Sequence, residues 1–243
     1  MHQGYYIVKE NTKLTENVYR MVLAGDTAGI RPGQFIEIKI DGFFLRRPIS
    51  VCDADEHTVT IIYKTVGEGT KALSLIKEGS LDVLTQLGNG YDLSVSGEAP
   101  VLIGGGVGVP PLYMTAKELI GQGKKVTVIL GFNTKDEIFY EDEFRALGAD
   151  VYVTTVDGSY GIKGFVTEAL KETAYTYFYT CGPLPMLKSV YKNTVTEGQF
   201  SLEERMGCGF GACMGCSIET KAGKKRICKE GPVFRKEELA WED

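Results

Sequence analysis

Four of the six cysteines lie within the last 36 residues of this 243-residue chain, and they constrain its fold more than any other feature. The first three follow the spacing C-x4-C-x2-C, which is the ligand pattern of plant-type 2Fe-2S proteins, where four thiolates hold two irons. We expect the glycines between them to adopt positive φ and to direct backbone amides at the sulfurs. The candidate ligands are Cys208, Cys213, Cys216 and Cys228, and the intervening glycines are Gly207, Gly209, Gly211 and Gly215.

A tetrahedral zinc site is the alternative for the same four cysteines, because four thiolates also suit zinc. Zinc ribbons usually contain paired C-x2-C units, and only Cys213 and Cys216 form such a unit here, so the spacing favours iron and sulfur. Only 11 residues separate Cys216 from Cys228, which predicts a compact loop. Cys52 is expected to be a small buried hydrophobe, whereas Cys181 either packs in the core or lies beside a ligand.

The length argues against a disulfide scaffold. A chain of 26.7 kDa buries roughly 70% of its unfolded surface on folding and needs no covalent staple. From residue 4 to about residue 97, apolar and polar residues alternate in short runs separated by turn residues. This pattern predicts an antiparallel barrel or sandwich, interrupted by one short helix over residues 70–77.

Beyond Pro100 the pattern changes to continuous apolar runs that alternate with helical stretches, including residues 111–121, 136–147 and 163–171. Such alternation predicts a parallel sheet wound on both faces. The Gly- and Cys-rich stretch from Gly207 marks a third piece. The expected fold is therefore β plus α/β, with a first domain over residues 1–97, a second over 98–200 and a small cluster-binding subdomain over 201–243.

Two motifs in the first domain suit a phosphate group. Residues 45–50, Leu-Arg-Arg-Pro-Ile-Ser, place two arginines beside a proline on an apolar strand, and arginine binds phosphate through two parallel hydrogen bonds. Residues 66–71, Val-Gly-Glu-Gly-Thr-Lys, open the short helix. Glycines there permit a close approach, Thr70 can cap the helix, and a helix N-terminus favours a pyrophosphate.

A dinucleotide loop is expected in the second domain. Residues 104–111, Gly-Gly-Gly-Val-Gly-Val-Pro-Pro, follow an apolar strand and precede a helix. Three further loops, 131–133, 155–158 and 181–183, also end strands, so all four should gather on one edge of the sheet. No acidic residue directly ends the second strand, and Lys135 could meet a 2′-phosphate, so these residues leave NAD and NADP both open.

These motifs, in this order, resemble the ferredoxin-NADP reductase superfamily. With residues 201–208 (Ser-Leu-Glu-Glu-Arg-Met-Gly-Cys) and 228–234 (Cys-Lys-Glu-Gly-Pro-Val-Phe), the whole chain more closely resembles the electron-transfer subunits of two-component, NAD-dependent dihydroorotate dehydrogenases. The resemblance implies a barrel that binds FAD, a sheet that binds NAD and a 2Fe-2S cluster. It also implies an FMN-containing catalytic subunit as partner, with two copies of each chain in a heterotetramer, and a role in pyrimidine (UMP) biosynthesis.

By the same resemblance, Arg47 contacts the FAD phosphates, Ser50 lies near the reactive flavin nitrogen, and Gly69 and Thr70 hold the pyrophosphate. Members of the superfamily often have tyrosine at position 49, and Tyr63 is the candidate that replaces its ring. The implied cofactor-binding residues are Arg47, Pro48, Ile49, Ser50, Ile62, Tyr63, Lys64, Gly67, Gly69 and Thr70.

Several functions are disfavoured. The formal net charge of −5 provides no general phosphate-binding face, which argues against nucleic acid. The uncharged stretch over residues 99–116 contains too many glycines and prolines for a membrane helix, and the N-terminus lacks a secretory signal, so we expect a cytoplasmic protein. His2 and His57 lie at the terminus and in a loop, and electron transfer requires no acid, base or nucleophile, so no catalytic residue is predicted.

Two alternatives remain at this point. The same module can serve an NAD(P)H-ferredoxin oxidoreductase or the diaphorase part of a sulfhydrogenase. The other alternative is a zinc-binding regulatory protein without enzymatic activity.

Overall fold

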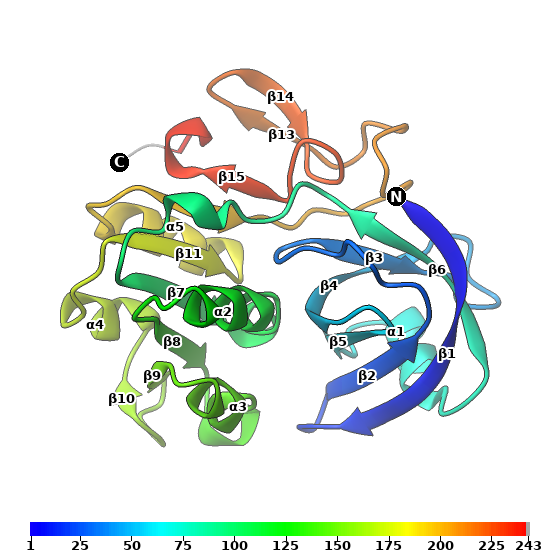
Figure 1. Ribbon diagram of the computed structural model, residues 1–243, viewed down its shortest axis with the longest axis horizontal. Coiled ribbons are helices and arrows are strands. Elements are labelled where there is room, and N and C mark those ends of the chain that lie inside the picture. The colour runs from blue at the N-terminus through cyan, green and yellow to red at the C-terminus, as the bar shows by residue number, and fades with distance from the viewer. Residues whose placement is uncertain (242–243) are drawn as a thin grey trace.

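The computed structural model describes residues 1–241. Its first part is a closed antiparallel barrel with the strand order β1-β2-β5-β4-β3-β6, on the right of Figure 1. Side chains that alternate toward the inside form its core, among them Tyr6, Met21, Ile36, Ile61 and Val83. The strands are β1 (His2–Lys13), β2 (Val18–Ala24), β3 (Phe35–Ile38), β4 (Arg47–Ala54), β5 (Thr58–Lys64) and β6 (Ser80–Leu87). The predicted barrel is confirmed.

A single α-helix, α1 (Glu68–Leu75), lies between β5 and β6 and begins two residues earlier than its sequence pattern predicts. The Thr70 hydroxyl explains that start. Its Oγ1 accepts hydrogen bonds from the N–H groups of Val66 (2.9 Å) and Gly67 (3.2 Å) and donates to the Gly67 carbonyl (3.1 Å). The hydroxyl thus closes the first turn of the helix.

The second part is a seven-stranded sheet with the order β10-β9-β8-β7-β11-β12-β15, on the left of Figure 1. Its first six strands are parallel, and β15 joins β12 in the antiparallel direction. The strands are β7 (Pro100–Gly105), β8 (Thr127–Phe132), β9 (Asp150–Thr155), β10 (Ile162–Lys163), β11 (Tyr177–Cys181), β12 (Gly198–Ser201) and β15 (Val233–Arg235). Short 3₁₀ turns lie at Leu93–Val95, Gly106–Gly108, Lys135–Glu137 and Lys236–Glu238.

Helices cover both faces of this sheet, as the alternation of strands and helices predicts. On one face Leu102 of β7 shares a core with Leu112 of α2 (Pro111–Gly121) and Phe144 of α3 (Glu141–Ala146). On the other face Ile103 shares a core with Leu170 of α4 (Val166–Lys171) and Leu187 of α5 (Leu184–Asn193). Successive residues of β7 therefore enter opposite cores.

Two of these helices are shorter than expected because left-handed residues interrupt them. Tyr140 has a φ of 68° directly before α3, and Gly164 has a φ of 119° shortly before α4. The predicted helix over residues 136–147 is therefore reduced to a 3₁₀ turn and one short helix. The one predicted over residues 163–171 begins only at Val166.

The third part is a hairpin, β13 (Ser217–Thr220) and β14 (Gly223–Arg226), which lies at the top of Figure 1. This hairpin accounts for the short spacing between Cys216 and Cys228, because it returns the chain to its starting point. The Ile227 N–H donates to the Cys216 carbonyl at 3.1 Å. None of the helices within residues 1–241 has the length and hydropathy needed to span a membrane.

Candidate functional site

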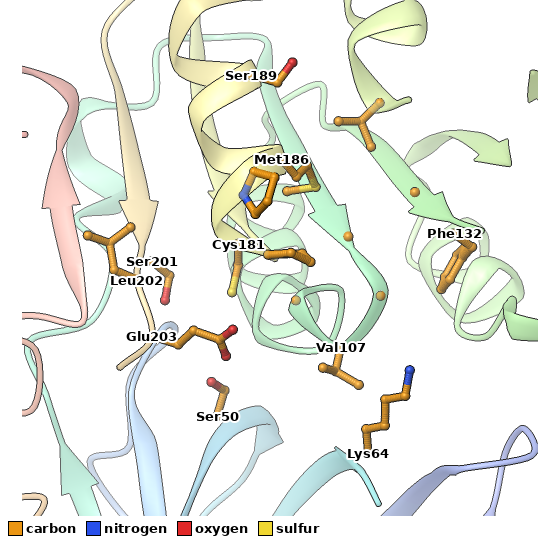
Figure 2. Close-up of a pocket in the computed structure, with 18 of the residues that line it drawn as sticks. Ser50, Lys64, Val107, Phe132, Cys181, Met186, Ser189, Ser201, Leu202 and Glu203 are labelled. Atoms are coloured by element: carbon orange, nitrogen blue, oxygen red, sulfur yellow. The ribbon is translucent and has the colours of Figure 1, made fainter. Parts of the chain in front are cut away.

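A cleft of about 670 Å³ lies between the barrel and the sheet. This volume is within the range of small-molecule and cofactor sites. Pro48, Ser50 and Lys64 of the barrel line the cleft. Figure 2 shows Ser50 and Lys64 at this wall. The four strand-ending loops of the sheet contribute the opposite wall, through Gly105, Gly106, Gly131, Phe132, Asn133, Val156, Cys181, Gly182 and Pro183. The expectation that these loops gather on one edge of the sheet is confirmed.

The dinucleotide loop approaches its neighbour so closely that one glycine is obligatory. A Cβ at Gly108 would lie 2.3 Å from the carbonyl oxygen of Cys181, at the end of β11. Gly106 has a φ of 52° and no atom within 4 Å of the place of its missing Cβ. The loop therefore presents bare backbone to the cleft, as a dinucleotide site requires.

The two arginines of the first motif have different roles. Arg46 is bound to Asp82 through Oδ2 (2.7 Å) and the backbone carbonyl (2.9 Å), so its guanidinium group fastens the barrel. The Arg47 guanidinium lies over the Phe43 ring at 4.8 Å and against the first turn of α1. A Cβ at Gly69 would overlap it, 2.2 Å from Nε. Arg47, the arginine that the resemblance implies as the phosphate contact, is therefore the one whose guanidinium is not held by Asp82.

Arg47 and the start of α1 together suit an anion. The arginine supplies positive charge beside backbone N–H groups of the first helical turn, and Gly69 leaves the space in which they meet. Thr70 supports this arrangement by capping, since its hydroxyl is already bonded to Val66 and Gly67. These residues fit a pyrophosphate group such as that of FAD.

Strand alternation divides the remaining predicted flavin residues. Pro48 and Ser50 face the cleft, whereas the Ile49 side chain packs on the barrel core. Lys64 also lines the cleft, and Ile62 is buried in the core between barrel and sheet.

The Tyr63 side chain points into the barrel and away from the cleft. Its ring is buried inside the barrel, its hydroxyl donates to Asn11 Oδ1 at 2.9 Å, and it stacks on Tyr19 at 5.9 Å. The expectation that the Tyr63 ring replaces a stacking ring at position 49 is therefore wrong. Its backbone remains a predicted contact of the flavin.

The four thiols of the loop are neighbours. Cys208 interacts with Cys213, and Cys228 interacts with both Cys216 and Cys208. The Cys228 N–H also donates to Cys216 Sγ at 3.4 Å. Within residues 1–241 no three His, Cys, Asp or Glu side chains are gathered as ligands of one metal ion. A two-iron cluster takes two thiolates for each iron, and these four thiols can supply them.

Backbone amides converge on Cys208. The N–H groups of Ala212 and Cys213 lie 3.2 and 3.4 Å from its sulfur. Burial raises the pKa of the Cys208 thiol, but hydrogen bonds from the backbone at Cys213, Phe210 and Ala212 outweigh it and bring the pKa to about 6. A thiolate is the metal-binding form of cysteine, so the loop is prepared for metal.

The glycine expectation is confirmed only in part. Gly209 and Gly211 have φ values of 72° and 92°, whereas Gly207 and Gly215 are not in the left-handed region. Met214 is, with a φ of 62°. Gly207 and Gly215 instead lie close to Cys213, where an added Cβ would be 3.3 and 3.5 Å from its sulfur.

The two cysteines outside the loop, Cys52 and Cys181, have different environments. Cys52 is fully buried, and burial raises the pKa of its thiol, so the expected packing role is confirmed. Cys181 lines the cleft, and burial raises its thiol pKa to about 12 although Ser201 opposes the shift. Cys181 is therefore a neutral neighbour of any ligand in the cleft.

Sequence reasoning missed Glu203. In Figure 2 the Ser50 hydroxyl, the Cys181 thiol and the Glu203 carboxylate point into the same part of the cleft. Glu203 follows β12 by two residues. Its place just after a strand of the parallel sheet was the available signal, because ligands bind at the carboxyl ends of such strands.

Comparisons with known proteins agree with this geometry. The family model for the iron-sulfur cluster binding domain of dihydroorotate dehydrogenase B matches residues 203–240, and an oxidoreductase NAD-binding domain matches residues 102–192. The dihydroorotate dehydrogenase B (NAD(+)) electron transfer subunit of Fusobacterium nucleatum is 46% identical, with 93% of this chain and 94% of that protein covered. The subunit of the same name from Bacillus pumilus is 44% identical, with 99% of each covered.

Solved structures share the same architecture. The structure of an NADH-dependent reduced ferredoxin-NADP oxidoreductase has a TM-score of 0.88 and 33% identity, and the match covers 97% of this chain and 90% of that one. Phthalate dioxygenase reductase, at 16% identity and a TM-score of 0.67 over 79% of this chain and 64% of that one, shares the fold.

Proposed function

This chain belongs to the family of dihydroorotate dehydrogenase B (NAD(+)) electron transfer subunits, and we propose that it moves electrons between a separate catalytic subunit and NAD. The observation that carries the proposal is that three sites lie together in one chain, at the junction of barrel and sheet. They are the four-cysteine loop, the anion site at Arg47 and the dinucleotide cleft.

FAD, when bound, exchanges a hydride with NAD and single electrons with an iron-sulfur cluster, so it can connect the two. The residues of this chain position the two cofactors relative to each other. Arg47 and the first turn of α1 bind the pyrophosphate, and Pro48 and Ser50 line the flavin side of the cleft. Residues 105–108 bind the nicotinamide cofactor on the opposite wall, and apolar side chains such as Phe132 and Met186 exclude water.

The cysteine loop performs the remaining task. Cys208, Cys213, Cys216 and Cys228 bind the 2Fe-2S cluster, and the amides directed at Cys208 tune its reduction potential. Dihydroorotate is oxidised to orotate on an FMN-containing partner subunit. The electrons enter this chain at the cysteine loop and leave it as NADH at the cleft, in the service of UMP synthesis.

The organisation of the protein follows from this role. We assign residues 1–97 to FAD, 98–200 to NAD and 201–243 to the cluster, and we expect two copies of this chain and two of the partner in a cytoplasmic complex. The sheet crosses the last boundary, since β15 of the cluster region pairs with β12.

The isolated chain provides a first test through its spectrum. FAD together with a 2Fe-2S cluster gives a brown-yellow protein, and NADH should bleach the flavin absorption and produce the EPR signal of a reduced cluster. A colourless protein with tightly bound zinc would contradict the proposal and support the regulatory alternative.

A second function is favoured by the structural likeness to a ferredoxin-dependent oxidoreductase at 33% identity. The chain would then serve as the diaphorase module of a ferredoxin-dependent enzyme. The two functions separate when the protein is purified with its natural partner and supplied with NAD: dihydroorotate should yield NADH, and reduced ferredoxin should not.

A further inference from the structure

Glu37 on β3 is a buried carboxyl group that the electron route described above does not use. The residue is 1% exposed. Its Oε2 is the one buried side-chain nitrogen or oxygen within residues 1–241 that lacks a hydrogen-bond partner. A buried polar atom without a hydrogen-bond partner costs free energy. Oε2 therefore indicates a hydrogen bond that a further group supplies.

The side chain of Glu37 meets the cysteine loop. A Cβ at Gly209 would lie 2.1–2.3 Å from the carboxyl atoms of Glu37, so the loop backbone passes directly over that group. Gly209 is itself buried, and its N–H forms no hydrogen bond with any other described residue. A buried acceptor without a partner therefore lies directly against the buried backbone at the start of the cysteine loop.

The backbone of Glu37 belongs to the flavin side. In β3, Glu37 pairs with Pro48 of β4, and its neighbour Ile38 pairs with Arg47. The charge of Arg46 acts on the Glu37 carboxyl group, but the side-chain hydrogen bonds of Arg46 go to Asp82 instead. One residue thus contacts the flavin-binding strand through its backbone and the cluster loop through its side chain.

We propose that Glu37 is a positioning residue that fixes the first part of the cysteine loop, residues 208–211, on the flavin-binding strands. Its Oε2, which has no hydrogen-bond partner in this structure, is the acceptor available to the loop backbone around Gly209. This contact sets where the cluster lies relative to the flavin. The inference rests on the proposed function, because it requires a cluster at the four cysteines.

The first experiment compares three variants of the FAD- and cluster-loaded chain. Glu37→Leu removes the acceptor and Glu37→Gln keeps an acceptor oxygen. Glu10→Gln is the control, because Glu10 is a barrel carboxyl group on β1 that is bound to Arg20. The readouts are the half-life of the cluster absorption under an iron chelator and the EPR signal of the reduced cluster.

Glu37→Leu should shorten the half-life about tenfold or more and broaden the EPR signal, with bound FAD retained. Glu37→Gln should restore both readouts, and Glu10→Gln should leave the EPR signal as in the unaltered chain. An unchanged cluster in Glu37→Leu, or equal losses in Leu and Gln variants, would overturn the proposal. A wild-type chain without iron and sulfide would instead contradict the proposed function itself.

A double-mutant cycle tests the contact if Glu37→Leu fails to fold. Gly209→Ala should shorten the cluster half-life much more in the wild-type chain than in Glu37→Ala, because the added Cβ collides with the carboxyl group. Gly211→Ala is the control for backbone strain, since Gly211 also has a positive φ but faces Lys229. Equal Gly209→Ala effects in both backgrounds would show that no such contact exists.

Discussion

The two arginines of residues 45–50 show what decides function at the residue scale. They are adjacent and chemically identical, yet one is bound to Asp82 and the other meets the first turn of α1. No local pattern separates them, because Asp82 is 36 positions away in sequence from Arg46. The resemblance implies Arg47 alone as the phosphate contact, and the barrel supplies the physical reason that Arg46 is engaged elsewhere.

Arg47→Ala is expected to weaken FAD binding about 10- to 100-fold, the value of one or two charged hydrogen bonds. Arg46→Ala is the matched control and should leave FAD affinity within a few fold while lowering stability. Flavin fluorescence titration of the apo-flavin chain measures both. Equal losses of affinity would mean that both arginines face the phosphates.

Asp82→Asn is expected to destabilise the barrel by about 1–3 kcal/mol at pH 7. The hydrogen bond from Arg46 lowers the pKa of Asp82 below its ordinary 3.8. The carboxylate therefore contributes fully above that value, and its contribution is lost only as the pH falls below it. Urea unfolding should show a constant difference between variant and wild type from pH 8 to pH 5, and a difference that changes across this range would refute the assignment.

At the element scale, most strands and helices followed from periodicity, and the departures have local causes. Helix α4 begins later than predicted because Gly164 has a left-handed backbone conformation. Helix α3 is shorter than predicted because Tyr140 has the same conformation. The β13–β14 hairpin was not expected at all. Its strands are four residues each and mostly polar, so hydrophobic alternation gave no signal.

The hairpin predicts which spacing in the cysteine loop can change. Lys221 and Ala222 form its exposed turn, so two glycines inserted between them should leave the iron content unchanged. One glycine inserted between Met214 and Gly215 should abolish the cluster, because it moves Cys216 away from Cys228. Iron analysis of both variants decides the point. Cluster loss in the turn insertion would show that the hairpin has a further role.

At the scale of the whole molecule, the sequence suggested three consecutive parts, whereas the fold connects them. Strand β15 from the cluster region completes the sheet of the second part, and Glu37 of the barrel reaches the cysteine loop. Both contacts join residues far apart in sequence. Periodicity and motif spacing describe only local structure, which is why neither contact was predictable.

Cys213→Ser tests how separate the sites are in the intact chain. The variant should lose the cluster, because a serine hydroxyl replaces the thiolate ligand, and should keep NADH-dependent dye reduction, since Arg47 and the cleft lie outside the loop. Loss of FAD from this variant would show that the cysteine loop also holds the flavin part together.

The most direct test of the central claim is the formation of NADH from dihydroorotate by this chain reconstituted with its catalytic partner. The complex should reduce NAD at a steady rate, and each chain alone should not. The complex assembled with Cys213→Ser should also fail, although the variant still oxidises NADH with a dye. NADH formation by the isolated chain, or an unchanged rate with Cys213→Ser, would contradict a route through the cysteine loop.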